Sequence, residues 1–409
     1  MIKYLTREHD STRSSRPFDN IAGYVLIKQE LEKHLKLQER RGAVSGIAIT
    51  GSKQLGKYYM ASVFAEATGR SILCFEGRDF SKSTIHEVAD ILSRMGVNDR
   101  CLLLFRDIDK AASLWAEQLN DCIHEAGKDV YIVATGENDN VAPLMENGLI
   151  DFKIPVDAPT LDDTKAILVR LLDEKYQRHL FDVNIEDMAA ITYQYKYGEL
   201  DRLLHNCVLE SRLSYKGRVS LDCMMQVAMS KVFDRFSITE DFKEEELKTA
   251  CIHEAGHALT GMLMGFPIGY ASVCKWGKSE RIGYTLVLQN MDELKQTVQG
   301  MMMSLGGLAA EEICNGQITI GGKADLQNVL EALKEAIIEN GTYGIEYVEI
   351  LSDSDIATEL QSMREKKIQE ELVKLYEKTK QLLSSHEKEL LQIAERLIDK
   401  GYVIRNFMI

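Results

Sequence analysis

Two histidines and a glutamate stand close together in the second half of this chain, in the run His253-Glu-Ala-Gly-His257. On a helix, residues four apart lie on one face, so His253 and His257 can direct two imidazole nitrogens at one metal ion. Glu254 lies one residue along and can take a proton from a water molecule at that metal. The pattern predicts a hydrolytic metal site; the alternative is two unrelated histidines on a helix.

A third ligand must come from elsewhere, because zinc hydrolases usually use three protein ligands and leave one position for water. The candidates are Glu311 and Glu312 in the run GGLAAEE, and Asp325 in the run GGKAD. Asp325 opens an amphipathic helical pattern and could equally cap that helix. Either glutamate could be a ligand, a hydrogen-bond partner of a histidine, or a solvated surface residue. Spacing alone leaves the choice open.

A stretch with strand character lies between the histidines and these carboxylates and contains Gly283, Tyr284 and Thr285. The edge of such a strand can bind an extended peptide through main-chain hydrogen bonds, which depend little on the peptide's sequence. We therefore expect these three residues to contact substrate. A plain hairpin without a binding role is the alternative.

The elements that must position these residues follow from the pattern of apolar side chains. Residues 18–156 alternate strand-like runs with helical patterns, which predicts a parallel α/β sheet. The predicted strands span residues 46–50, 71–75, 101–105 and 130–135. Residues 157–235 carry helical periodicity and predict a helical subdomain, and residues 236–409 predict a mainly helical domain with the metal motif. Residues 1–17 are expected to form a flexible arm.

A phosphate-loop pattern, G-x-x-x-x-G-K, follows the first predicted strand and contains Gly51, Gly56 and Lys57. Backbone amides and a lysine in this setting bind phosphates. Two positions that should bind Mg²⁺ are changed: Tyr58 replaces a small hydroxyl residue, and Arg106 replaces a carboxylate. The pattern indicates a domain that has kept its fold and lost its catalysis. Binding of ATP or ADP without turnover is the alternative.

The composition is that of a globular protein and limits the classes of partner. A chain of 409 residues predicts two or three domains. Its 49 Lys and Arg against 63 Asp and Glu give a net charge of −14, which argues against nucleic acid as a partner. Neither a signal peptide nor a run of about 18 apolar residues is found, so we expect a cytoplasmic protein without a membrane span.

The order of these motifs resembles the FtsH family of AAA zinc proteases. The similar runs are FDNIAGYVLIKQELEKHLK, YGELD, CIHEAGHALTG, RIGYTL, SLGGLAAEEICNG and ADLQ. The resemblance implies an AAA-like α/β domain with a helical lid, followed by a mainly α-helical zinc metallopeptidase domain. It implies that His253, His257 and Asp325 bind zinc. Glu254 would then be the general base, and Glu312 would contact one of the zinc ligands without binding zinc itself. A hexamer and unfolded-protein substrates are implied as well.

Several positions depart from the ATPase pattern of that family. Beside the two Mg²⁺ positions, Asp107 replaces the glutamate that activates water, and Gly136 stands where an asparagine is expected. The run MENGLID at 145–151 lacks the arginines that reach a neighbour's nucleotide. The run after Phe80 lacks the aromatic loop that grips substrate. ATP hydrolysis is therefore expected to be absent or severely impaired, whereas the protease motif shows no such loss.

Taken together, the residues and the resemblance predict a zinc endopeptidase that cleaves unfolded or flexible polypeptides without hydrolysing ATP. We expect it to work as a homo-oligomer such as a hexamer. One alternative is a non-enzymatic regulatory or scaffold subunit of an AAA protease assembly, which the altered nucleotide site favours. The other is a protease gated by ATP that Lys57 holds without hydrolysis.

Overall fold

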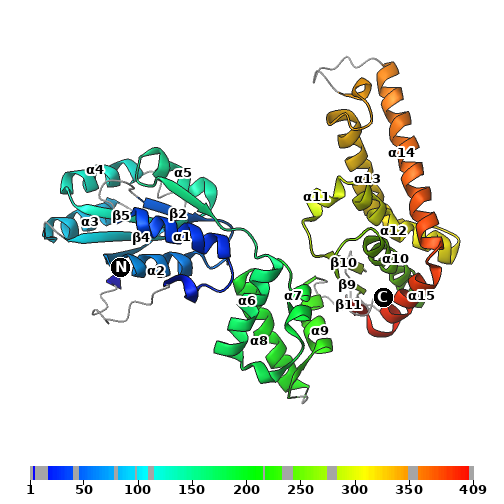
Figure 1. The fold of residues 1–409 in the computed structure, drawn as a ribbon, viewed down its shortest axis with the longest axis horizontal. Helices are drawn as coiled ribbons and strands as arrows, with labels where there is room; N and C mark the ends of the chain where they lie inside the picture. The colour runs from blue at the N-terminus through cyan, green and yellow to red at the C-terminus, as the bar shows by residue number, and fades with distance from the viewer. Residues whose placement is uncertain are drawn as a thin grey trace. The chain divides into compact units, whose positions relative to one another are not determined.

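The computed structural model describes residues 3–4, 17–39, 46–77, 82–96, 99–108, 115–214, 217–232, 243–273, 283–348 and 358–404. They form two compact units, each described here by itself (Figure 1): residues 1–180 with 192–206, and residues 181–191 with 207–409. Three expectations fall outside the described residues. These are the loss of a gripping loop after Phe80, most of the arm at 1–17, and the boundary near residue 235.

A parallel sheet forms the centre of the first unit. Its described strands lie in the order β1-β3-β4-β5-β2-β6. They are β1 (Lys3–Tyr4), β2 (Gly46–Thr50), β3 (Ser71–Glu76), β4 (Arg100–Ile108), β5 (Asp129–Gly136) and β6 (Phe152–Pro155). Strands β2 to β6 are parallel, and β1 pairs antiparallel with β3. The four strands predicted from the sequence are confirmed. Strand β1 lies inside the expected arm, so this part of the arm is paired.

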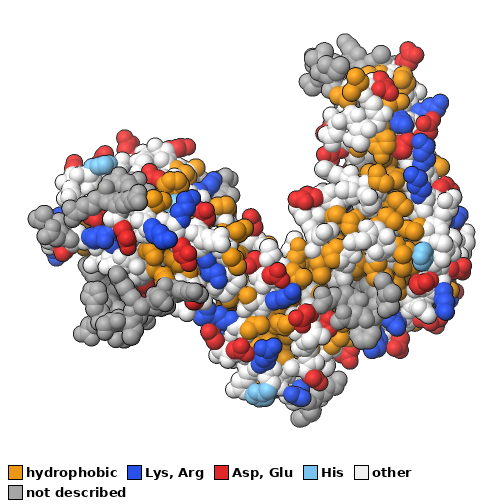
Figure 2. Space-filling model, in the orientation of Figure 1, with side chains coloured by type: hydrophobic (Ala, Val, Ile, Leu, Met, Phe, Trp, Pro, Cys, Tyr) orange, Lys and Arg blue, Asp and Glu red, His pale blue; other side chains and the backbone are white. Residues whose placement is uncertain are grey.

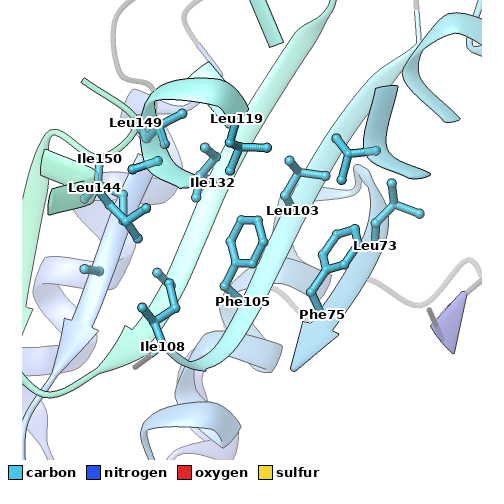
Figure 3. Packing of buried hydrophobic residues seen from close by; sticks show 14 of the residues in the cluster. Leu73, Phe75, Leu103, Phe105, Ile108, Leu119, Ile132, Leu144, Leu149 and Ile150 are labelled. Atoms are coloured by element: carbon cyan, nitrogen blue, oxygen red, sulfur yellow. The ribbon is translucent and has the colours of Figure 1, made fainter. Parts of the chain in front are cut away.

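Helices cover this sheet because its central strands are apolar on both faces. In β4 the run Cys101–Phe105 is buried throughout, which is typical of a central parallel strand. Phe105 stacks on Phe75 of the neighbouring strand with ring centroids 5.3 Å apart (Figure 3). The helices are α1 (Val25–Leu37), α2 (Lys57–Thr68), α3 (Lys82–Arg94), α4 (Ala116–Ala126) and α5 (Asn138–Glu146). Side chains of α3, α4 and α5 share one apolar cluster with β3, β4 and β5.

The described residues between 157 and 232, which fall in the predicted helical subdomain, are mainly helical. The helices are α6 (Leu161–Leu171), α7 (Ile185–Ile191), α8 (Tyr197–Leu213) and α9 (Leu221–Val232). A capping box starts α6, since Thr160 and Asp163 bond each other's backbone amides. A two-stranded ladder that the sequence analysis did not foresee joins β7 (Phe181–Asp182) to β8 (Val219–Ser220). The first unit contains α6, whereas α7 and α9 belong to the second.

Where the structure describes it, the second unit is mainly helical and contains a small antiparallel sheet. Besides α7 and α9, its described α-helices are α10 (Glu244–Leu263), α11 (Met291–Lys295), α12 (Val298–Asn315), α13 (Lys323–Lys334), α14 (Thr358–Ser384) and α15 (Glu387–Lys400). The sheet has the order β10-β9-β11, with strands β9 (Ile268–Val273), β10 (Gly283–Val287) and β11 (Tyr402–Ile404). Helix α10 packs against α12, α15 and β9, so it lies at the centre of this unit.

The long helix α14 is amphipathic. Its buried side chains include Ile368, Leu375 and Leu383, and charged side chains lie along its exposed side (Figure 2). Among the helices that the structure describes, none has the length and apolar character needed to cross a membrane.

Candidate metal centre

Helix α10 holds the two histidines of the metal motif. His253 and His257 lie one turn apart, and their Nε2 atoms are 2.9 Å from each other. Three glutamates occupy the first turn of the helix, where the positive end of the helix dipole stabilises negative charge. The helix ends at Leu263, just before Gly265, which has a φ of 85°. Such a left-handed glycine commonly terminates a helix.

Close packing of α12 against α10 makes the site compact. A Cβ atom on Gly256 would lie 2.3 Å from the carbonyl oxygen of Gly306, so only glycine permits this approach of the two helices. A Cβ atom on Gly307 would lie 2.5 Å from the ring of His253. Gly306 therefore permits the close approach of the two helices, and Gly307 leaves the space that the His253 ring occupies.

Helix α13 supplies a carboxylate to the same point. Oδ2 of Asp325 lies 3.1 Å from Nε2 of His253 and 3.4 Å from Nε2 of His257. Asp325 is the third residue of α13, and the N-cap position belongs to Gly322, which makes no side-chain cap. The carboxylate therefore faces the histidines and is not the helix cap considered from the sequence.

These three side chains fit a zinc ion. Within the described residues, their ligand atoms all lie within 4.8 Å of one another. Zinc–ligand bonds of about 2.0–2.2 Å in a tetrahedral arrangement separate neighbouring ligand atoms by roughly 3.3–3.6 Å. The observed separations of 2.9, 3.1 and 3.4 Å lie close to that range. Two imidazoles and one carboxylate also form a donor set that zinc accepts in hydrolases.

Hydrogen bonds behind the rings fix which nitrogen faces the site. Nδ1 of His257 donates to the carbonyl oxygen of Met303 at 2.8 Å, and Nδ1 of His253 donates to Oε1 of Glu311 at 2.6 Å. Because Nδ1 of each ring donates a hydrogen bond, Nε2 is the nitrogen that each ring directs toward the shared position and that could bind a metal. At 2.9 Å, the two Nε2 atoms attract each other only with a positive charge, a proton or a metal ion, between them.

The structure places Glu311 behind His253, which corrects the expectation that Glu312 has this position. Successive residues on a helix point about 100° apart, so only one of the two glutamates can face α10. Glu311 lies four residues after Gly307, the residue against the His253 ring, and this spacing could have identified it. Glu312 instead accepts hydrogen bonds from α14, from Lys380 Nζ at 2.8 Å and from the hydroxyl of Tyr376.

The charges of the site favour a cation at its centre. Burial alone would lower the pKa of His253, but hydrogen bonds with Asp325 and Glu311 outweigh burial and raise this pKa to about 10. Burial would raise the pKa of Asp325, yet its bonds with the two histidines hold that pKa well below its usual range. For Glu311, burial is likewise opposed by bonds from His253 and Thr319, which lower the pKa. The pocket thus stabilises positive charge at the two Nε2 atoms.

The residues expected to act on substrate line the same cleft. It has a volume of about 970 Å³ and is lined by the three candidate ligands, Glu254, Gly283, Tyr284 and Thr285. Strand β10 lies at the edge of the described sheet, paired with β9 on one side. The hydroxyl of Thr285 donates to Oε2 of Glu254 at 2.6 Å. Sequence reasoning missed this contact, because it gave the two residues separate roles.

The phosphate-loop residues Gly51, Gly56 and Lys57 join β2 to α2, as predicted. Nζ of Lys57 donates to the carbonyl oxygen of Ser52 at 2.6 Å, so the lysine bonds its own loop. Burial lowers the pKa of Lys57, although the charges of Asp107 and Glu137 oppose this. The loop thus has the expected position in the fold, with its lysine turned inward.

The two altered Mg²⁺ positions contact each other. The guanidinium of Arg106 lies over the ring of Tyr58, 4.7 Å from its centroid, an arrangement that attracts cation to ring. Arg106 also pairs with Glu76 at 3.3 Å, on the surface of the unit. Where a nucleotide-hydrolysing site would hold a carboxylate and a small hydroxyl, this chain has a cation stacked on a phenol.

Comparison with known proteins agrees with this geometry. Residues 241–407 match the model of peptidase family M41. The ATP-dependent zinc metalloprotease FtsH 3 of Symbiobacterium thermophilum is 25% identical over 94% of this chain. FtsH 1 of Conexibacter woesei is 24% identical over 91% of it, and FtsH of Thermotoga maritima is 24% identical over 87%. This chain is similar to the FtsH-type zinc metalloproteases.

The FtsH-type relatives are longer than this chain, which spans 69%, 63% and 65% of those three proteins. Among solved structures, the Thermotoga maritima RuvB Holliday junction branch migration motor matches 61% of this chain and is itself covered to 84%. That match has 17% identity and a TM-score of 0.43. The parallel sheet of the first unit and the helical M41 region of the second agree with the predicted fold class.

Proposed function

We propose that this protein is a zinc-dependent endopeptidase that cleaves unfolded or flexible polypeptides. The observation that carries the proposal is the convergence of His253, His257 and Asp325 on one point, with Glu254 beside them in the same cleft. The match of this region to peptidase family M41 supports a protease rather than another metal-dependent hydrolase. The substrate class follows from the strand edge, which can bind a backbone with little regard to sequence.

Each side chain has a distinct task in this proposal. Zinc bound by the three ligands would act as a Lewis acid on the peptide carbonyl and make a water molecule more acidic. Glu254 takes the proton of the attacking water and later gives it to the leaving amine. Glu311 keeps His253 in the tautomer with a free Nε2. The backbone of Gly283, Tyr284 and Thr285 would align the peptide.

We further propose that cleavage proceeds without ATP hydrolysis. Arg106 stacked on Tyr58 puts a positive charge where a carboxylate would hold Mg²⁺. Lys57 is occupied by a carbonyl of its own loop. Homo-oligomeric assembly, for example as a hexamer, and a cytoplasmic location are predictions that follow from the sequence.

A second candidate function is that of a regulatory or scaffold subunit in an AAA protease assembly. The contact between Arg106 and Tyr58 favours it, because a subunit that only assembles needs no ATP hydrolysis. Light scattering after size exclusion separates the two candidates. A stable homo-oligomer with bound zinc favours the peptidase, and assembly only with a complete AAA protease favours the subunit.

Cleavage of fluorescently labelled casein tests the main proposal. The protein is measured as purified, after chelation, and after zinc is restored, each time with and without Mg-ATP. Cleavage that requires zinc and is indifferent to ATP supports both parts of the proposal. Stimulation by ATP contradicts the second part, and no cleavage by zinc-loaded protein contradicts the first.

A further inference from the structure

Thr285 and Glu254 are in contact, although one lies on β10 and the other on α10. The hydroxyl of Thr285 donates to Oε2 of Glu254 at 2.6 Å, a distance typical of a strong hydrogen bond to a carboxylate. The side chain of Glu254 is largely buried, since the residue is only 7% exposed. Solvent therefore has little access to replace this donor, and the orientation of the carboxylate depends on its protein neighbours.

Gly283 lies against Oε1, the other oxygen of the Glu254 carboxylate. Alternate residues of a strand lie on one face, so Gly283 and Thr285 face Glu254 together. A Cβ atom at Gly283 would lie 2.3 Å from Oε1 of Glu254 and 2.3 Å from its Cγ. The missing side chain thus leaves the space that Oε1 occupies, while the threonine holds Oε2. Two residues of one strand define the rotation of the carboxylate.

We propose that Thr285 is a positioning residue for Glu254 in peptide hydrolysis, an inference that rests on the proposed function. With Oε2 bound to the threonine, Oε1 stays free to accept a proton from the attacking water. The water oxygen forms its bond to the peptide carbonyl carbon as this proton moves. The same proton then passes from Oε1 to the amine nitrogen as the C–N bond breaks. Strand β10, which is proposed to bind the peptide, would thus also orient the carboxylate of Glu254.

This role differs measurably from the contact with substrate that the sequence suggested for Thr285. Without the hydrogen bond from Thr285, the carboxylate of Glu254 can rotate and spends less time oriented toward the water. This change lowers kcat. A side chain that only binds substrate changes KM when it is removed. The two roles therefore separate in steady-state kinetics.

The test compares Thr285→Val, which removes the hydroxyl and keeps a β-branched shape, with Thr285→Ser, which keeps the hydroxyl. Cleavage of a quenched fluorescent casein peptide gives kcat and KM at equal zinc content. We expect kcat of the valine variant to fall about 10- to 100-fold with KM nearly constant, and the serine variant to stay close to wild type. A raised KM at unchanged kcat, or a serine variant as slow as the valine variant, would overturn the proposal.

A double-mutant cycle tests the contact without any reference to catalysis. Thermal unfolding midpoints are measured for wild type, Thr285→Val, Glu254→Ala and the double variant. If the two side chains act as a pair, the double variant loses less than the sum of the single losses, because each single change already breaks the bond. Additive losses would overturn the pairing. If zinc-loaded wild type cleaves no casein, the proposed function fails, and the cycle still decides whether Thr285 holds Glu254.

Discussion

The buried carboxylate of Glu311 accepts a hydrogen bond from Nδ1 of His253 at 2.6 Å, and this bond ties α12 to the metal centre on α10. The other oxygen of Glu311 accepts the backbone N–H of Thr319, also at 2.6 Å, so the carboxylate is held at both ends. A carboxylate behind a histidine fixes the tautomer and makes the opposite nitrogen a better metal ligand. The neighbouring Glu312 carries the same charge but has no such contact.

Glu311→Gln should therefore weaken zinc binding by about 10- to 100-fold. The amide keeps the shape of the side chain but removes the negative charge opposite Nδ1 of His253. Glu312→Gln is the matched control, since Glu312 pairs with Lys380 and Tyr376 on α14. Competition against a chromophoric zinc chelator gives both affinities. Equal losses in the two variants would contradict the assignment of Glu311.

Asp325→Ala should abolish zinc binding at stoichiometric metal, and cleavage with it. The change removes one of three ligands and leaves two histidines, too few for a stable zinc site. Glu331→Ala, at an exposed position of the same helix, is the control for damage to α13. Metal content after dialysis, measured by atomic absorption, checks the prediction. A variant that retains one equivalent of zinc would show that Asp325 is not a ligand.

ATP should be hydrolysed no faster by the wild type than by Lys57→Ala, with or without Mg²⁺. The physical reason is the guanidinium of Arg106, which lies over Tyr58 in the place of a Mg²⁺ ligand. Phosphate release from ATP is the measurement. If the wild type releases phosphate faster than Lys57→Ala, and this release depends on Mg²⁺, then Tyr58 and Arg106 do not prevent hydrolysis.

Asp129→Asn should lower the free energy of unfolding at pH 7 by about 1–3 kcal/mol. Oδ1 of Asp129 lies 2.7 Å from the buried guanidinium of Arg70, and Oδ2 lies 3.1 Å from Arg100. Burial would raise the pKa of Asp129, but these two arginines lower it.

Because the pKa of Asp129 is lower in the folded state than in the unfolded chain, the stabilisation is complete above about pH 4. It is lost as the pH falls through the folded-state pKa. The difference in the free energy of unfolding between wild type and Asp129→Asn should therefore become smaller at acidic pH. Urea unfolding at pH 7 and at a pH near 3 measures this difference at each pH. A difference that is larger near pH 3 than at pH 7 would contradict the prediction.

Much of the fold could be predicted because local patterns specify it. The run Cys101–Phe105 is apolar at every position, which predicts a strand buried on both faces, and β4 is such a strand. The histidine spacing likewise places both rings on one face of α10. By contrast, Lys3–Tyr4 and Phe181–Asp182 are too short to carry a periodic signal, and they form strands through pairing with distant residues.

The finer arrangement of the site depends on how helices and strands pack. Whether Glu311 or Glu312 faces His253 depends on the rotation of α12 about its axis. The contact between Gly306 of α12 and Gly256 of α10 sets this rotation. The contact between Thr285 and Glu254 joins a strand to a helix and leaves no trace in local spacing. Such relationships are tertiary, so a single sequence does not specify them by itself.

The most direct measurement of the central claim compares wild type with Glu254→Gln in the cleavage of labelled casein, both loaded with one equivalent of zinc. The substitution leaves His253, His257 and Asp325 in place and removes only the group that accepts the proton. We predict zinc-dependent cleavage by the wild type and none above background by the variant, at equal zinc content. Cleavage by the variant at the wild-type rate would contradict the account.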